Sequence, residues 1–123
     1  MITVKLKRIY EPPTEADGRR YLVERLWPRG MSKEKAKLDD WLKNVAPSVE
    51  LRRWYDHDPA KWTEFRRRYF AELGKKPEVL SAIRKAAEKG QVTLVFAAKN
   101  VELSCAMALK EFLENLPEDD KMA

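Results

Sequence analysis

A short apolar run in the last third of the chain constrains the fold more than any other feature. Residues 92–98 read Val-Thr-Leu-Val-Phe-Ala-Ala, and so short a run with β-branched residues is typical of a strand buried on both faces. Two earlier strands are predicted, because residues 2–10 begin with alternating apolar and polar side chains and residues 21–27 are mostly apolar. Buried strands of this kind favour a parallel sheet between layers of helices.

Helical spacing of apolar residues fills the segment between the second and third strands. It predicts three or four helices, with starts at Ser32, Ser48, Asp58-Pro59 and Pro77, and Asn100 is expected to cap a last helix. We therefore predict a single compact layered α/β domain over residues 1–118, with a small, mostly parallel sheet flanked by about five helices, and a frayed tail over residues 119–123. The short first connection leaves the direction of the first strand open.

Length and composition exclude several classes of protein. A chain of 123 residues suits one domain, and no apolar run approaches the ~20 residues of a membrane span, so we expect no membrane partner. One cysteine and one histidine exclude an internal disulfide and a Cys/His zinc site, and we expect no metal and no cofactor. The lone thiol favours the cytoplasm, and many Lys, Glu and Arg with few Asn and Gln are the usage expected of a heat-adapted protein.

Positive charge is unevenly distributed along the chain. The 25 basic and 20 acidic residues give a net charge of +5. The excess lies in the first two thirds, in arginine clusters at residues 19–20, 52–53 and 66–68. We therefore expect one basic face, which suits an anionic ligand or a nucleic acid.

The carboxyl ends of the predicted strands carry a set of cations. In open parallel sheets, ligands bind beyond this edge because loops and helix N-termini meet there. The second strand reaches Arg25, with Trp27 and Arg29 just beyond, and the third ends at Lys99 and Asn100. If the strands are parallel, the three cations face one crevice near the last helix, where they would attract a phosphate, a carboxylate or a nucleic-acid backbone.

Each candidate also has a purely structural interpretation. Trp27 suits the hydrophobic core, and Arg25 suits an internal ion pair. His57 beside Asp58 resembles an acid–base pair, although capping of the following helix explains Asp58 better. Cys105 lies early in the last helix, where a thiolate would be activated, but its place in an apolar stripe favours a buried, inert thiol.

Several motifs carry a resemblance to a known family. The most specific is Leu-Trp-Pro-Arg-Gly at residues 26–30, which stands with Arg-Ile-Tyr-Glu-Pro-Pro at 8–13, His-Asp-Pro at 57–59 and Ala-Ala-Lys-Asn at 97–100. In these motifs, and over nearly its whole length, the chain resembles the YeaO-like proteins of the family called domain of unknown function 488. The resemblance implies a compact α/β domain of the bacterial and archaeal cytoplasm, and it supplies no reaction.

The resemblance also carries over candidate site residues by the family's pattern: Arg25, Trp27, Arg29, His57, Asp58 and Lys99. One position departs from that pattern. Where YeaO-like proteins commonly have an Asn-His pair early in the last helix, this chain has Ser104-Cys105. A function that needs this histidine is in doubt here unless the thiol replaces it.

The sequence leaves three functional hypotheses. The first is an anion-binding protein, whose ligand would contact Arg25, Trp27, Arg29, Lys99 and Asn100 and, in an enzyme, react with His57 and Asp58 as the acid–base residues. The second is a nucleic-acid or protein interaction module on the arginines of residues 52–53 and 66–68. The third is a protein without a ligand, in which the motif residues only brace the fold.

Overall fold

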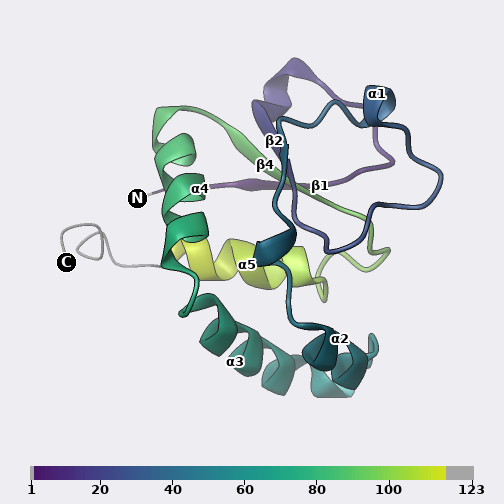
Figure 1. The fold of residues 1–123 in the computed structure, drawn as a ribbon, viewed down its shortest axis with the longest axis vertical. Coiled ribbons are helices and arrows are strands. Elements are labelled where there is room, and N and C mark those ends of the chain that lie inside the picture. Colours follow the sequence, from purple (N-terminus) through teal and green to yellow (C-terminus); the bar gives the residue numbers. More distant parts are fainter. Residues whose placement is uncertain (1, 116–123) are drawn as a thin grey trace.

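The computed structural model describes residues 2–115 and has a four-stranded sheet at its centre (Figure 1). The strands are β1 (Lys5–Arg8), β2 (Arg19–Leu22), β3 (Asp40–Trp41) and β4 (Val92–Phe96), in the order β1-β4-β2-β3. Every neighbouring pair is parallel, which determines the direction of the first strand. The predicted α/β class is confirmed, and the expected tail at 119–123 lies outside the described residues.

Five α-helices accompany the sheet in residues 2–115: α1 (Lys33–Ala36), α2 (Val49–Tyr55), α3 (Trp62–Leu73), α4 (Pro77–Lys89) and α5 (Cys105–Glu114). Three 3₁₀ turns lie between elements: η1 (Glu15–Asp17), η2 (Lys43–Val45) and η3 (Pro59–Lys61). Helices α4 and α5 pack on the sheet, α3 packs on α5, and α2 on α3 (Figure 1). No helix in this part of the chain is both long and apolar enough to cross a membrane.

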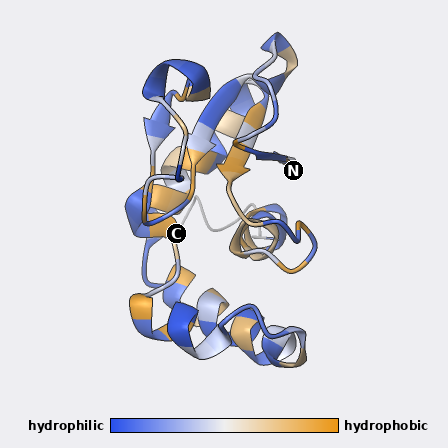
Figure 2. Ribbon diagram, turned by 90° about the vertical axis from the view of Figure 1, so that its right-hand side faces the viewer, coloured by the Kyte–Doolittle hydropathy of each residue, from blue (hydrophilic) through white to orange (hydrophobic). Residues whose placement is uncertain are grey.

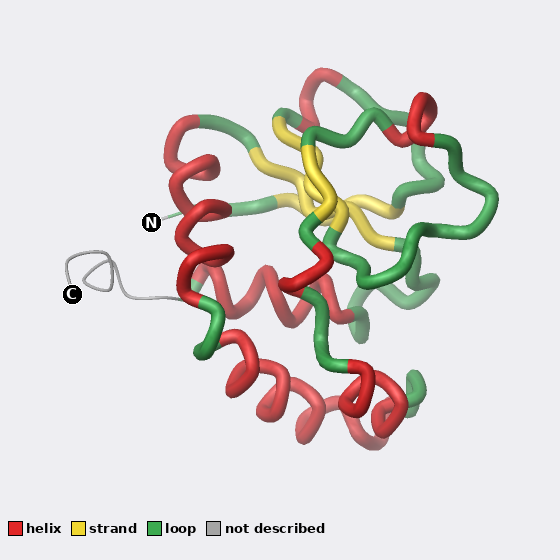
Figure 3. The backbone as a smooth tube through the Cα atoms, viewed as in Figure 1, coloured by secondary structure: helices red, strands yellow, loops and turns green. Residues whose placement is uncertain are grey.

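The two faces of the sheet are covered differently. Along β4, Val92, Leu94 and Phe96 are buried in the larger core cluster beneath the helices. Val95 points the other way, into a smaller cluster that the long connection between β2 and β3 covers (Figure 3). The hydropathy colouring shows hydrophobic, orange segments within the strands of the sheet (Figure 2). The prediction that this strand is buried on both faces is confirmed.

Three predicted helix starts are also confirmed. The Ser48 hydroxyl accepts a hydrogen bond from a backbone N–H in the first turn of α2, and the Asp58 carboxylate does the same at η3, directly before α3. Pro77 is the first residue of α4. Capping acts within one helical turn, so these starts do not depend on distant partners.

The helix expected from Ser32 to Pro47 begins where predicted, because the Ser32 hydroxyl accepts the backbone N–H of Lys35 at 3.1 Å, but its predicted length is wrong. Only the single turn of α1 forms, and it ends at Lys37, whose φ of 48° is left-handed. The chain then pairs with β2: the backbone N–H of Asp39 donates to the carbonyl of Arg20 at 2.8 Å, and β3 follows. Pairing with a sheet edge and burial against the smaller cluster override the helical spacing here.

Two other boundaries differ from the prediction. The strand expected over residues 21–27 ends at Leu22, and the chain leaves the sheet at Glu24, whose carboxylate accepts the first backbone N–H beyond β4 at 3.0 Å. Asn100 does not cap the last helix. Ser104 does so, while the Asn100 side chain accepts a hydrogen bond in the preceding turn.

A buried ion-pair cluster joins the connection between β1 and β2 to both strands. Asp17, only 5% exposed, accepts hydrogen bonds from Lys7 Nζ at 3.0 Å and Arg20 Nη1 at 2.7 Å. Burial raises the pKa of the Asp17 carboxyl, but hydrogen bonds from Thr14, Lys7 and Arg20 outweigh burial and lower it to about 2. Arg20, which the sequence placed on a basic face, is therefore an interior residue of the fold.

Replacing Gly18 with alanine is expected to lower the free energy of unfolding by roughly 2–4 kcal/mol, as measured by urea denaturation. Gly18 has a φ of +63°, and an added Cβ would lie 2.1 Å from the carbonyl oxygen of Gln91, which accepts the hydrogen bond that starts the pairing of β2 with β4. Gly30 is the control, because its φ is +77° but no described atom lies within 4 Å of an added Cβ. Equal losses in the two variants would contradict the steric argument.

Candidate functional site

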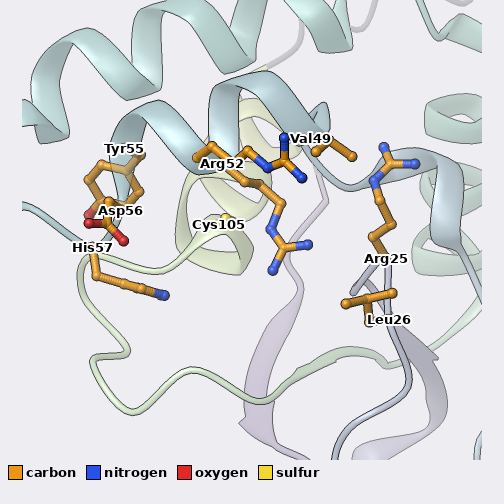
Figure 4. A pocket seen from close by; sticks show the side chains of 9 residues that line it. Arg25, Leu26, Val49, Arg52, Tyr55, Asp56, His57 and Cys105 are labelled. Carbon is orange, nitrogen blue, oxygen red and sulfur yellow. The ribbon is translucent and has the colours of Figure 1, made fainter.

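A pocket of about 390 Å³ lies at the carboxyl edge of the sheet (Figure 4). Three segments form it, and each follows the carboxyl end of a strand: the chain after β2, the α2 region after β3, and the start of α5 after β4. Parallel strands bring these segments to one edge, where open α/β sheets place their ligands. The lining residues are Arg25, Leu26, Val49, Arg52, Arg53, Tyr55, Asp56, His57 and Cys105.

Arg25 contributes a guanidinium that is only partly satisfied. Its Nη2 donates to the carbonyl oxygen of Pro47 at 3.1 Å, which ties the side chain to the turn before α2. Its Nε is buried and has no hydrogen-bond partner among residues 2–115. The Nε atoms of Arg66 and Arg84 share this condition, but neither residue lines the pocket. A buried donor without a partner is costly, so an acceptor placed there by a ligand would be favourable.

Arg52 and Arg53 bring two further cations from α2. Within the described chain, neither side chain forms a hydrogen bond or an ion pair. The arginines of α3 differ, since all of them pair with glutamates: Arg66–Glu111, Arg67–Glu64 at 2.6 Å and Arg68–Glu64 at 2.7 Å. The arginines at the pocket are therefore unpaired, whereas the three arginines of α3 share two glutamates.

Asp56 and His57 follow α2 with unusual backbone angles. Their φ values of 47° and 54° are left-handed, which costs a residue with a side chain roughly 1–2 kcal/mol. In the close-up, the imidazole of His57 lies across the opening from Arg25, with Arg52 between them (Figure 4). Asp56 is the C-terminal cap of α2 in this conformation, as Lys37 is of α1, so the left-handed angles mark the end of the helix and place His57 at the pocket.

The structure separates His57 from its predicted partner. Asp58 does not line the pocket, and its carboxylate accepts the backbone N–H of Ala60 at 3.0 Å as the cap of η3. The aromatic neighbour of the histidine is Tyr55, whose ring lies 6.2 Å away. Tyr55 stacks on Phe65 with ring centroids 4.3 Å apart, and its hydroxyl donates to the Leu103 carbonyl at 2.9 Å.

Cys105, the first residue of α5, places its thiol in the pocket. Burial, together with the nearby charge of Glu24, raises the pKa of this thiol to about 12, although Arg52 acts in the opposite direction. The thiol is therefore neutral at physiological pH. A neutral thiol is a poor nucleophile and a poor metal ligand, which agrees with the buried, inert thiol that the sequence favoured for Cys105.

The other predicted site residues lie elsewhere. The indole N–H of Trp27 donates to the Met31 carbonyl at 2.6 Å, and its ring packs within the smaller core cluster. Arg29 and Lys99 are exposed, and Asn100 belongs to the turn before α5. None of these four lines the pocket. The structure thus brings Arg25 and His57 together, and adds neighbours that the sequence assigned to a surface.

Arg52 and Arg53 are those neighbours, and no local signal identifies them as pocket residues. They belong to a short amphipathic helix that buries Leu51 and Tyr55, so helical spacing alone places them outside the core. They meet Arg25 only because α2 lies near both the end of β2 and the start of α5. In residues 2–115 no group of three or more His, Cys, Asp or Glu could hold a metal ion, and the donor set of the pocket suits an anion.

Comparison with known proteins gives consistent matches. Residues 3–123 match the family described as the inactive DUF488-N3 subclade. The uncharacterized protein YeaO of Escherichia coli (strain K12) is 36% identical over 115 residues, which cover 94% of this chain and 100% of YeaO. The uncharacterized proteins Rv3073c of Mycobacterium tuberculosis and Mb3100c of Mycobacterium bovis are each 41% identical over 110 residues, covering 89% of this chain and 92% of the relative. No solved structure matches the chain.

Proposed function

Because the chain belongs to the DUF488 family, in the subclade described as inactive, we propose that it binds an anionic small molecule without converting it. The proposed ligand is a phosphate or a carboxylate, and the proposed site is the pocket of Arg25, Arg52, Arg53 and His57. The cytoplasm is the proposed compartment, since a single cysteine suits reducing conditions.

The observation that carries the proposal is the set of guanidinium groups around one pocket. Two of them, on Arg52 and Arg53, have no partner in the described residues, and the Nε of Arg25 is buried without one. Like charges held close together repel one another. An anion would relieve this repulsion and accept charge-assisted hydrogen bonds from several donors at once.

Two features favour binding over catalysis. The raised pKa of Cys105 keeps the only thiol of the chain in its neutral form. Asp58 is engaged as a helix cap, which leaves His57 without the carboxylate partner expected from the sequence. Both features agree with the description of the subclade as inactive.

A nucleic-acid or protein interaction module is the second candidate. One observation favours it: the half-buried ring of Trp54 has the Arg68 guanidinium 4.2 Å and Lys61 Nζ 5.2 Å from its centroid. Single-stranded nucleic acids bind such combinations of aromatic and cationic groups. The glutamate partners of the α3 arginines weigh against it. Binding to a phosphate backbone should weaken steeply with salt, and binding in a pocket less so.

Inorganic phosphate is expected to bind the wild-type protein saturably, and Arg52→Gln to weaken that binding by about tenfold or more. The reason is that a hydrogen bond to a charged group contributes about 1.5–3 kcal/mol. Isothermal titration calorimetry at low ionic strength measures the affinity, with acetate as the carboxylate probe.

Arg67→Gln is the matched control for this experiment. It removes the same charge, but Arg67 is paired with Glu64 and does not line the pocket, so phosphate affinity should change little. Equal weakening by the two variants would refute the pocket as the site. Binding of a single-stranded oligonucleotide that Arg67→Gln weakens, and with which phosphate does not compete, would favour the second candidate.

A further inference from the structure

The pocket has an apolar part that a bare phosphate ion would not use. Leu26 is 69% exposed and Val49 is 41% exposed, and both line the pocket beside the arginines. Only four large hydrophobic side chains in residues 2–115 are exposed to this degree, and two of the four meet here. Exposed apolar side chains gathered at a concave site are typical of surfaces that bind a ligand.

The volume of the pocket agrees with an organic ligand. At about 390 Å³ it falls within the range of about 300–1,000 Å³ that is usual for small-molecule sites. Leu26 and Val49 lie on the Arg25 side of the opening, while His57 lies on the opposite side and Arg52 between them (Figure 4). Arg52 and His57 thus extend away from the two apolar side chains while Arg25 adjoins them, so a ligand with an anionic and an apolar end can contact both kinds of side chain.

From this arrangement we infer that the ligand is an organic phosphate or carboxylate that carries an apolar group about the size of one aromatic ring. The inference rests on the proposed function and narrows its ligand class. The anionic group contacts the guanidinium groups of Arg25 and Arg52, and the apolar group covers Leu26 and Val49 beside Arg25. A planar ring would also lie well against a guanidinium face, because guanidinium groups stack on aromatic rings.

Phenyl phosphate and inorganic phosphate are the probes that distinguish binding of an anion with an apolar group from binding of an anion alone. Phenyl phosphate is expected to bind at least about tenfold more tightly, since covering the apolar side chains removes their surface from water. Phenol, which has the ring without the negative charge, is expected to show no saturable binding. Calorimetric titration of the full chain at one fixed ionic strength gives all three affinities.

The double variant Leu26→Asn, Val49→Thr tests where the ring lies. Each substitution nearly preserves side-chain volume, and both positions are exposed, so the fold should persist, which a urea titration verifies. The ratio of the phenyl phosphate affinity to the inorganic phosphate affinity is expected to fall to about one. Val101→Thr is the control, because Val101 is also exposed, at 37%, but does not line the pocket, and the ratio should stay at its wild-type value.

The outcomes distinguish failure of the inference from failure of the proposed function. If phenyl phosphate binds no more tightly than inorganic phosphate, or if the double variant keeps the wild-type ratio, the inference is refuted and anion binding stands. If neither phosphate nor acetate nor phenyl phosphate binds, the proposed function itself fails. Tight binding of phenol would show that the negative charge of the ligand is not needed, and would overturn both the inference and the proposed function.

Discussion

Replacing Asp17 with asparagine is expected to lower the free energy of unfolding by about 3–5 kcal/mol, because the change leaves a buried cation without its counter-charge. The Arg20 side chain is buried, and Asp17 is its only carboxylate partner in the described residues. Lys7 loses the same partner. The remaining hydrogen bonds of the Arg20 side chain go to backbone carbonyls at the end of α1, which accept hydrogen bonds but do not neutralise its charge.

Urea denaturation at neutral pH measures this loss, and Glu64→Gln is the matched control. Glu64 also accepts hydrogen bonds from two basic side chains, Arg67 and Arg68, which lower the pKa of its carboxyl to about 2. It lies at the surface, however, where solvent screens the interaction, so its replacement should cost much less. A similar loss for the two variants would show that burial of the Asp17 cluster contributes little.

The Asp17 carboxylate should make the free energy of unfolding depend on pH in the acid range. The pKa of Asp17 is about 2 in the folded protein against 3.8 in the absence of interactions. A lowered pKa contributes stability that is present above pH 3.8 and is lost as the pH falls toward 2. Wild-type protein should therefore lose about 2 kcal/mol more than Asp17→Asn over this interval. Parallel pH profiles for the two proteins would contradict the assignment.

Cys105 is expected to react with iodoacetamide at least about 30-fold more slowly in the folded protein than in the urea-unfolded chain at pH 8. The raised pKa, about 12 against an ordinary 9.0, lowers the thiolate fraction roughly 1,000-fold, and the greater nucleophilicity of a more basic thiolate recovers only about 20- to 30-fold of this. Mass spectrometry of quenched samples gives both rates.

Two controls connect this result to the pocket. Arg52 lowers the pKa of the thiol, so Arg52→Gln should slow alkylation further. Arg67 is not among the groups that shift this pKa and does not line the pocket, so Arg67→Gln should not change the rate. The rate in the folded protein should also rise by about tenfold per pH unit above pH 8, since the thiolate fraction does so. A folded-state rate close to that of the unfolded chain would mean that the thiol is activated, and would reopen a catalytic role for the pocket.

Part of the candidate site could be predicted from the sequence. Arg25 was predicted as a site residue because ligands bind beyond the carboxyl ends of parallel strands, and His57 because it is the single histidine of the chain. Both line the pocket. Arg29 and Lys99 followed from the same rule but do not line the pocket, because the rule gives the edge of the sheet and not the course of the loops. Their role in ligand binding stays a prediction, as does that of Trp27.

The sequence by itself determined those elements whose signals lie within a few residues. They include the buried strand β4, the helix starts at Ser48, Asp58 and Pro77, and the motifs that identified the family. Such signals are local hydrogen bonds and local hydrophobic patterns, which operate in the same way in any surroundings.

Only the tertiary structure decided how distant segments meet. The residues after α1, which the sequence predicted to be helical, form β3 instead, because they hydrogen-bond to the edge of β2 and cover the smaller core cluster. The tertiary structure also placed Arg52 beside Arg25, 27 residues earlier in the chain, and buried Arg20 against Asp17. Contacts of this kind form only when the sheet has assembled, because they are stabilised by the burial of hydrophobic side chains from many distant segments in one core.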